Sequence, residues 1–415
     1  MRFTMVPISH SSNVTFLGHT DQGGRPDGVQ IMVDRGHAYI GHMFSDGISV
    51  IDVGNPDDPK PVNFVACAAN TRAHHLQLHD GILLAVNSAN VWALQKYQSQ
   101  QDYFTNAIDD SFTRRERPFV AGLRVYDVSA DPAAPREIGF CAVEGIGLHR
   151  LWWTGGRYAY ASAHMDGFAD FVLVIFDVGD PAKPTLAGYW ALPGMNRKAG
   201  ETPAWPKGKR WALHHAIPAD GKLYGAWRDG GLTVHDLSDP VAPVLLSHTV
   251  LSPPFAGGTH TPLPLPGRQL AIVADEAVSS NCAAGLAHTW VFDVRDAGNP
   301  ISIATLPQPE ELNYCAVGGK FGPHNLHENR PGAFQSENLI FATWHNAGVR
   351  VFDISNAFRP REVGHLVPGA PRELVDIRPG AVPVTQSADV FVDRNGLMYI
   401  TDTNAGLTIA QFEDF

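Results

Sequence analysis

Short runs of β-branched and aromatic residues, separated by glycine, aspartate and proline, recur along most of the chain. The first four runs are GVQIMV, AYIGHM, ISVIDV and VNFVAC. Runs of this length between turn residues are typical of strands. An aspartate can bond the backbone N–H groups of a turn, and a proline after it stops the strand from continuing. The pattern therefore predicts repeated units of four short antiparallel strands.

The turn after the third strand of each unit gives the clearest repeat. It reads SVIDVGNPDDPKPV from Ser49, VIFDVGDPAKPTLAG from Val174 and VFDISNAFRPREVG from Val351. Six copies are marked by an aspartate at the end of the strand: Asp52, Asp127, Asp177, Asp236, Asp293 and Asp353. Self-similarity at a period of about 40–50 residues indicates a propeller or solenoid. Four antiparallel strands per unit favour the propeller, because they form one blade.

The two ends of the chain together supply one more unit. Residues 387–411 contain three strands, and SNVTFLGHT from Ser12 resembles the outer strands of other units. Pairing of the two ends would close the ring and remove an open sheet edge. We therefore predict an all-β fold, a single seven-bladed β-propeller over residues 1–415, closed by the N-terminal strand joining the last blade. The expected blades span residues 26–67, 72–141, 147–190, 211–250, 258–306, 322–368, and 386–411 with 12–20.

The repeated strand and turn resemble the LVIVD-repeat β-propeller family over nearly the whole chain. The second copy departs most, since residues 91–118 interrupt it. The resemblance implies the propeller fold. It implies no particular activity, because that family is a structural class of mixed functions.

Five histidines and one aspartate occupy the same place in six of the units. They are His74, His149, His214, His260, His324 and Asp389, and all but His324 lie seven residues before a turn glycine. Equivalent positions of a propeller meet around its axis, so we expect these side chains to cluster at the axial mouth. An imidazole-rich cluster suits a divalent transition metal, with iron or copper favoured and zinc or manganese as alternatives. Shared polar scaffolding and metal-free acid–base histidines are the competing interpretations.

A second set of polar residues is expected near the same face. The candidate catalytic residues are His42, Arg150, His164, Arg228, His345 and Asp402. They would orient ligand imidazoles or contact the substrate, and Arg150 or Arg228 would stabilise an enolate. His75, His215 and Asn325 directly follow ring positions, so strand alternation predicts that they point to the opposite side.

Four long segments open mainly on the histidine face: residues 91–118, 191–211, 277–288 and 366–386. Loops longer than about 12 residues are often lids or binding loops. The first is expected to contain a short helix carrying Trp92, Tyr97, Tyr103 and Phe104, which either packs the loop down or covers the channel. The second is rich in lysine and arginine, which would attract an anionic substrate.

Composition narrows the class of partner. The net charge of −11 argues against nucleic acid or an anionic membrane. No apolar run is long enough to span a bilayer, and the N-terminal residues lack a secretory apolar region. The four cysteines have no CxxC spacing. These features predict a cytoplasmic protein with free thiols, acting on a small molecule; the oligomeric state is left open.

These observations favour a metal-dependent oxidoreductase or oxygenase acting on a small organic substrate. The expected site is similar in plan to histidine-ligated propeller enzymes, such as carotenoid cleavage oxygenases and selenium-binding-protein type thiol oxidases. A metal-assisted lyase or hydrolase acting on a carbohydrate or acidic molecule, similar to oligogalacturonate lyases, is one alternative. A protein-binding scaffold is the other. The chain contains no GxxxxGK[ST], no GxGxxG after a strand and no HExxH.

Overall fold

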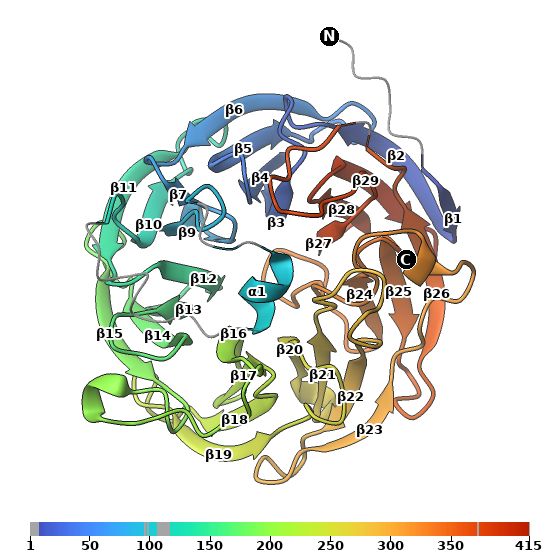
Figure 1. The fold of residues 1–415 in the computed structure, drawn as a ribbon. Coiled ribbons are helices and arrows are strands. Elements are labelled where there is room, and N and C mark those ends of the chain that lie inside the picture. The colour runs from blue at the N-terminus through green and yellow to red at the C-terminus, as the bar shows by residue number, and fades with distance from the viewer. Residues whose placement is uncertain (1–7, 95–96, 98, 106–116, 372, 415) are drawn as a thin grey trace.

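The computed structural model shows a nearly all-β chain whose strands surround a common centre (Figure 1). It describes residues 8–94, 97, 99–105, 117–371 and 373–414. The predicted all-β, propeller-like architecture is confirmed. The helical elements described are α1 (Gln100–Thr105) and three short 3₁₀ turns at Arg197–Ala199, Pro266–Arg268 and Tyr314–Ala316.

The described strands form antiparallel groups that follow one another along the chain. The first contains β3 (Gly28–Asp34), β4 (His37–His42), β5 (Gly47–Asp52) and β6 (Lys60–Ala66). The second contains β8 (Leu76–His79), β9 (Ile82–Ala89), β10 (Gly122–Asp127) and β11 (Arg136–Ala142), with β7 (Thr71–Arg72) also on β9. The third contains β12 (Gly147–Trp152), β13 (Tyr158–His164), β14 (Phe171–Asp177) and β15 (Thr185–Trp190).

The later groups repeat this order. The fourth contains β16 (Trp211–Ala219), β17 (Lys222–Arg228), β18 (Leu232–Asp236) and β19 (Val244–Thr249). The fifth contains β20 (Thr259–Leu265), β21 (Leu270–Asp275), β22 (Thr289–Asp293) and β23 (Ile301–Thr305). The sixth contains β24 (Leu339–Thr343), β25 (Val349–Asp353), β26 (Arg361–Val367) and β1 (His10–Ser12). The last contains β27 (Ser387–Val392), β28 (Leu397–Asp402), β29 (Gly406–Phe412) and β2 (Val14–Thr20).

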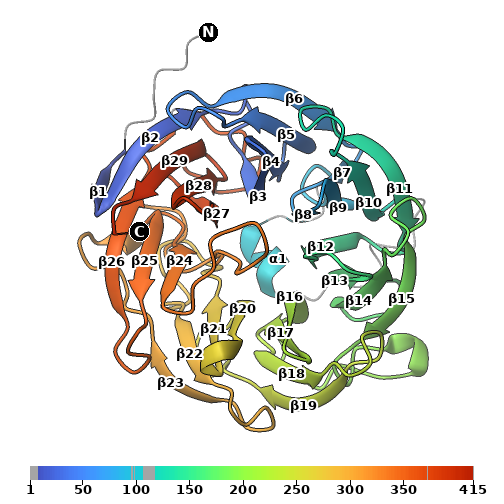
Figure 2. The same ribbon diagram turned by 180° about the vertical axis from the view of Figure 1, so that it is seen from behind.

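The N-terminal segment lies on the outside of the two groups nearest the C-terminus. Its strand β2 pairs with β29 from Val14↔Phe412 to Thr20↔Leu407, which is the pairing predicted from sequence. Its strand β1 pairs with β26 as an additional outer strand. Figure 2, seen from behind, shows β1 and β2 along the outer rim, next to the last groups. The two ends of the chain are therefore held together by backbone hydrogen bonds.

The core lies between neighbouring groups. Its largest cluster joins Leu84 of β9, Val174 of β14 and Leu213 of β16, all buried. Because each group packs on the next, the inner strands face the centre of the ring, where Figure 1 also shows α1. The polar residues at the starts of these strands are thus directed to one central region.

The inner strands are irregular near their starts. The pairing register shifts between Leu148 and Leu151 in β12, and between Trp211 and His215 in β16. Similar shifts occur between Thr259 and Thr261 in β20 and between Ser387 and Asp389 in β27. A bulge of this kind breaks the strict alternation of side chains. Consecutive residues at the predicted ring positions can therefore both face the axis.

Two of the four cysteines form a disulfide. Cys282 and Cys315 are bonded to each other, whereas Cys67 and Cys141 are free. The prediction of four free thiols is therefore wrong. It failed because Cys282 and Cys315 lie 33 residues apart in separate loops, and only the fold brings them together. Within the described residues, we find no helix that is long and apolar enough to cross a membrane.

Candidate functional site

Five histidine rings lie side by side at the inner ends of consecutive groups. The Nε2 atom of His74 lies 3.0 Å from Nδ1 of His149. The ring centroids of His149 and His214 are 4.8 Å apart, and those of His214 and His260 are 3.4 Å apart. The ring of His324 continues the arc, 4.6 Å from that of His260. The structure thus brings together all five histidines that the repeat predicts to meet.

Asp389 occupies the equivalent place on β27 but makes a different contact. Its Oδ2 atom accepts a hydrogen bond from the backbone N–H of Ile31 at 3.2 Å. It belongs to neither of the buried His/Glu groups whose potential ligand atoms lie within 4.8 Å of one another. Burial raises the pKa of Asp389 to about 7, so the carboxyl group is partly protonated at neutral pH. Its role as a metal ligand stays a prediction.

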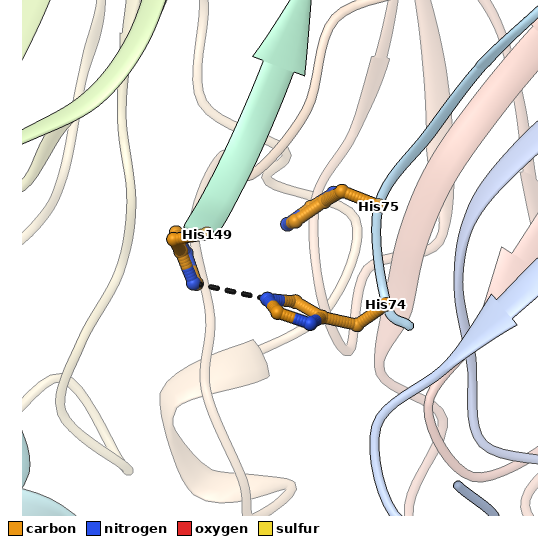
Figure 3. A group of neighbouring side chains, drawn as sticks. All are labelled: His74, His75 and His149. Atoms are coloured by element: carbon orange, nitrogen blue, oxygen red, sulfur yellow. Dashed lines mark hydrogen bonds between the residues drawn. The ribbon is translucent and has the colours of Figure 1, made fainter. Parts of the chain in front are cut away.

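His75 also faces the axis, which corrects the expectation from strand alternation. Its ring centroid lies 4.6 Å from that of His74 and 5.2 Å from that of His149. Figure 3 shows the three rings converging. Alternation does not apply here because β8 begins only at Leu76, after both histidines. His74, His75 and His149 form one buried group with potential ligand atoms within 4.8 Å of one another.

Two ring histidines have their tautomer set by the backbone. The Nδ1 atom of His214 lies 2.9 Å from the carbonyl oxygen of His260, and that of His324 lies 2.6 Å from the carbonyl oxygen of Ala388. A carbonyl only accepts, so Nδ1 carries the proton and Nε2 keeps a lone pair. Metal-binding histidines in proteins typically make this second contact.

Burial keeps the ring histidines neutral. It lowers the pKa of His74, His149 and His214 well below the usual value, and neighbouring positive charges and rings add to the effect. Burial also lowers the pKa of His324, to about 4. Neutral imidazole is the form that binds metals and accepts protons. The cluster is therefore ready for either role at neutral pH.

An ion-paired triad borders the same region. The carboxylate of Glu276 contacts Arg228 Nη1 at 2.6 Å and Lys320 Nζ at 3.0 Å, and it lies 3.8 Å from Nε2 of His260. Although burial opposes ionisation, Lys320 and Arg228 hold the pKa of the Glu276 carboxyl group well below its usual range. Glu276, His260 and His324 form the second buried group with ligand spacing.

Glu328 is the shared acceptor of a second group of buried polar side chains. Its carboxylate accepts hydrogen bonds from Arg150 at 2.8 Å, Gln77 at 3.0 Å and Gln30 at 3.3 Å. Arg150 also donates to Nδ1 of His75 at 3.0 Å. Sequence reasoning placed Glu276 among the polar residues expected near the histidine face, but it missed Glu328. The signal for Glu328 was a carboxylate in the HNLHENR segment, within a few residues of His324.

The histidine arc opens into a cavity of about 80 Å³. Trp92, Tyr103 and Phe104 of the 91–118 insertion form part of its wall. The predicted short helix is present as α1, but it carries only Tyr103 and Phe104, because it begins at Gln100, after Trp92 and Tyr97. The lid interpretation gains support from this placement, although residues 106–116 of the insertion lie outside the described part. Most of the ring histidines line the cavity: His149, His214, His260 and His324.

The candidate catalytic residues fall into two sets. Arg228 and His345 line the cavity. His345 stacks on His324 with ring centroids 4.8 Å apart, and its buried Nε2 atom has no hydrogen-bond partner within the described residues. Burial lowers the pKa of His345 well below its usual value.

The remaining candidates hold the surrounding structure. The imidazole of His42 contacts Asp27 at 3.2 Å and Ser49 at 2.8 Å. Asp402 accepts hydrogen bonds from several groups, including the backbone N–H of Gln386 at 2.7 Å. In the part of the chain that is described, His42, Arg150, His164 and Asp402 are not among the residues lining the cavity.

A family comparison matches two stretches of the chain. The LVIVD repeat matches residues 153–191 and 222–249, which contain β13 to β15 and β17 to β19. The chain is similar to LVIVD-repeat proteins over these two stretches. This agrees with the resemblance seen in the strand–turn pattern. No curated protein matches the chain in sequence.

Several solved structures resemble this chain in fold. A periplasmic gluconolactonase from Pseudomonas aeruginosa has a TM-score of 0.53 and 12% identity, over 93% of this chain and 91% of that one. A hypothetical selenium-binding protein from Sulfolobus tokodaii has a TM-score of 0.54 and 13% identity, over 88% and 82%. The WD40 repeats of RRP9 have a TM-score of 0.55 and 9% identity, over 98% of both chains. Identities this low show the propeller fold alone.

Proposed function

We propose that this protein is a metal-dependent oxidoreductase that acts on a small organic substrate in the histidine-lined cavity. The observation that carries the proposal is the contact of five buried, neutral imidazoles from five consecutive groups. Scaffolding alone would leave a ring nitrogen buried without a partner, and such buried polar atoms are costly. The buried Nδ1 of His74 is one example.

The ring spacing fits a bound ion. Two imidazole nitrogens that bind one metal at about 2.1 Å are about 3.0–3.4 Å apart. The separation of His74 and His149 is 3.0 Å, and the Nε2 atoms of His214 and His324 are preset as acceptors. Neutral nitrogen ligands suit iron, copper or zinc better than magnesium or calcium. Iron or copper bound by these rings would supply redox chemistry.

The surrounding residues have roles that do not depend on the identity of the metal. Tyr103 and Phe104 give the cavity an aromatic wall. Arg228 and Lys320, fixed by Glu276, place positive charge beside the arc. His345 can take a proton at its unpartnered Nε2 atom.

Oxygen uptake tests this function. The protein is loaded with iron or copper and supplied with small organic acids, and we expect oxygen consumption that His214→Ala abolishes. His37→Ala is the matched control. His37 is the first residue of β4 and His42 is the last, so His37 lies at the opposite end of this strand from the residue predicted to lie near the site. A protein that holds only zinc or manganese and consumes no oxygen would rule out the oxidoreductase.

One observation favours a second candidate, a metal-assisted lyase or hydrolase. Arg228 and Lys320 are buried cations that line the same cavity as His345, whose Nε2 atom has no partner within the described residues. A neutral imidazole can abstract a proton α to a carboxylate while nearby cations stabilise the enolate. Ultraviolet absorbance from a new carbon–carbon double bond would identify a lyase. If uronate oligomers neither bind nor react, a lyase acting on uronates is excluded.

The disulfide is evidence about the cellular compartment in which the protein folds. Disulfides persist in oxidising compartments and are rare in the cytosol. The Cys282–Cys315 bond therefore supports an oxidising location in place of the cytoplasmic one that the sequence predicts. The number of free thiols in protein isolated under thiol-blocking conditions distinguishes the two locations.

A further inference from the structure

Nearly every buried arginine of the described chain has a carboxylate partner. The pairs are Arg150 with Glu328, Arg210 with Asp170, Arg228 with Glu276, Arg330 with Glu328, and Arg350 with Glu311 and Glu362. Such pairing is expected, since a buried charge without a partner is strongly destabilising.

Arg72 is the exception. Its side chain lines the cavity and the residue is only 4% exposed. Within the described residues it has no carboxylate within ion-pair distance. Its Nη1 atom donates to the thioether sulfur of Met43 at 2.7 Å, and its buried Nε atom has no acceptor. A thioether is a weak acceptor, so the guanidinium has no direct anionic partner, and the carboxylate of Asp46 acts on it only from beyond ion-pair distance.

The position of Arg72 is fixed by the fold. Arg72 ends β7, where it pairs with Ser88 of β9, and His74 follows two residues later. The guanidinium therefore reaches the cavity beside the His74 end of the histidine arc.

The cavity as a whole is positively charged. Its charged lining residues, apart from histidine, are four cations, Arg72, Arg228, Lys320 and Arg378, and two carboxylates, Glu276 and Asp376. The net charge of these six groups is +2, in a protein of net charge −11. Local positive charge in an acidic protein favours an anionic ligand.

We propose that Arg72 binds the carboxylate of a small organic acid in the cavity. A guanidinium presents two N–H groups that match both oxygens of a carboxylate. The aromatic rings of Trp92, Tyr103 and Phe104 line the same cavity and would contact the apolar part of the acid. Small organic acids are then the substrate class of the proposed enzyme. Turnover of the acid rests on the proposed function, whereas its binding to Arg72 needs no metal.

Calorimetry with benzoate and acetate tests the proposal on protein freed of metal by a chelator and on protein reloaded with metal. We expect benzoate to bind, and Arg72→Gln to weaken binding by at least about 10-fold, as loss of a charge-assisted contact predicts. Arg72→Lys keeps the charge but loses the two-pronged geometry, so its affinity for benzoate should lie between those of Arg72→Gln and the natural protein. Arg157→Gln is the charge-matched control, because Arg157 is exposed and paired with Asp177.

A stability measurement guards against misfolded variants. Removing a buried charge that has no ion pair should leave the melting temperature of Arg72→Gln unchanged or raised, whereas Arg150→Gln should lower it by removing the nearest cation from Glu328. Equal benzoate affinity in Arg72→Gln and the natural protein, or no carboxylate binding with or without metal, would overturn the proposal. Metal binding by the histidines would stand in either case. Conversely, if the histidines bind no metal, the metal-free protein should still bind benzoate through Arg72.

Discussion

The Nε2 atom of His74 lies 3.0 Å from the Nδ1 atom of His149, although 75 residues separate the two in the chain. Each histidine stands at the start of the inner strand of its group. The contact therefore results from the ring arrangement of the groups and from no local motif. Contacts between neighbouring rings continue along the arc as far as His324, which is why a periodic histidine in the sequence becomes a cluster in space.

Loss of Glu276 should destabilise the fold. Glu276→Gln leaves Arg228 and Lys320 buried without their shared carboxylate, and breaking a buried ion pair costs about 3–5 kcal/mol. Urea unfolding should show a loss of this order. Glu137→Gln is the control, since Glu137 is exposed and its pair with Arg124 should contribute under about 1 kcal/mol. Equal losses in the two variants would contradict the buried triad.

Replacement of Asp389 should spare metal binding. Its Oδ2 atom is bonded to the backbone of Ile31, and the residue stands outside the buried ligand groups. Asp389→Asn keeps the size of the side chain, so elemental analysis should find the natural metal content. A loss of metal comparable to that of His149→Ala, which removes a member of a buried ligand group, would make Asp389 a ligand, as the repeat first predicted.

Reduction of the disulfide should weaken the wall of the cavity. Cys282–Cys315 joins two loops that also pair through Ser280 and Lys320. Closing a loop of this length contributes about 2–4 kcal/mol, so Cys282→Ser with Cys315→Ser should lower the free energy of unfolding by that amount. Cys67→Ser, at a free cysteine, serves as the control. Titration of four thiols in unreduced, unfolded protein would show that the bond does not form.

Stability should fall in mild acid through His327. Burial lowers its pKa to about 4, from 6.5, while its ring contacts the backbone of Phe334 and Val392. Between these values the unfolded chain binds the extra proton and the folded chain does not. Stability is therefore complete above about pH 6.5 and is lost towards pH 4, by up to roughly 3 kcal/mol.

Urea unfolding at several pH values checks this dependence. In His327→Gln the free energy of unfolding should change less steeply with pH across this window. Curves that run parallel for the variant and the natural protein would show that His327 does not contribute.

The fold was accessible from the sequence because strand runs and turn aspartates recur at each repeat. The pairing of β2 with β29 followed from the same pattern, since the last unit lacked a strand that the N-terminus could supply. The disulfide was not accessible, because Cys282 and Cys315 lie in loops whose positions depend on packing and not on periodicity.

The site was accessible only in part. The histidine arc follows from the repeat, but Glu328 and Arg72 have no equivalent in the other repeats and therefore give no periodic signal. Their importance appears only with burial, which decides which charges lack a partner. His75 was misplaced because alternation was applied before its strand begins at Leu76.

The most direct test of the central claim is the metal content of untagged protein purified without chelator, measured by elemental mass spectrometry. We expect near-stoichiometric iron or copper in the natural protein and in His37→Ala, with large losses in His74→Ala, His149→Ala and His214→Ala. A natural protein that contains no transition metal, and binds none after incubation with iron, copper or zinc, would contradict a metal centre in the histidine arc.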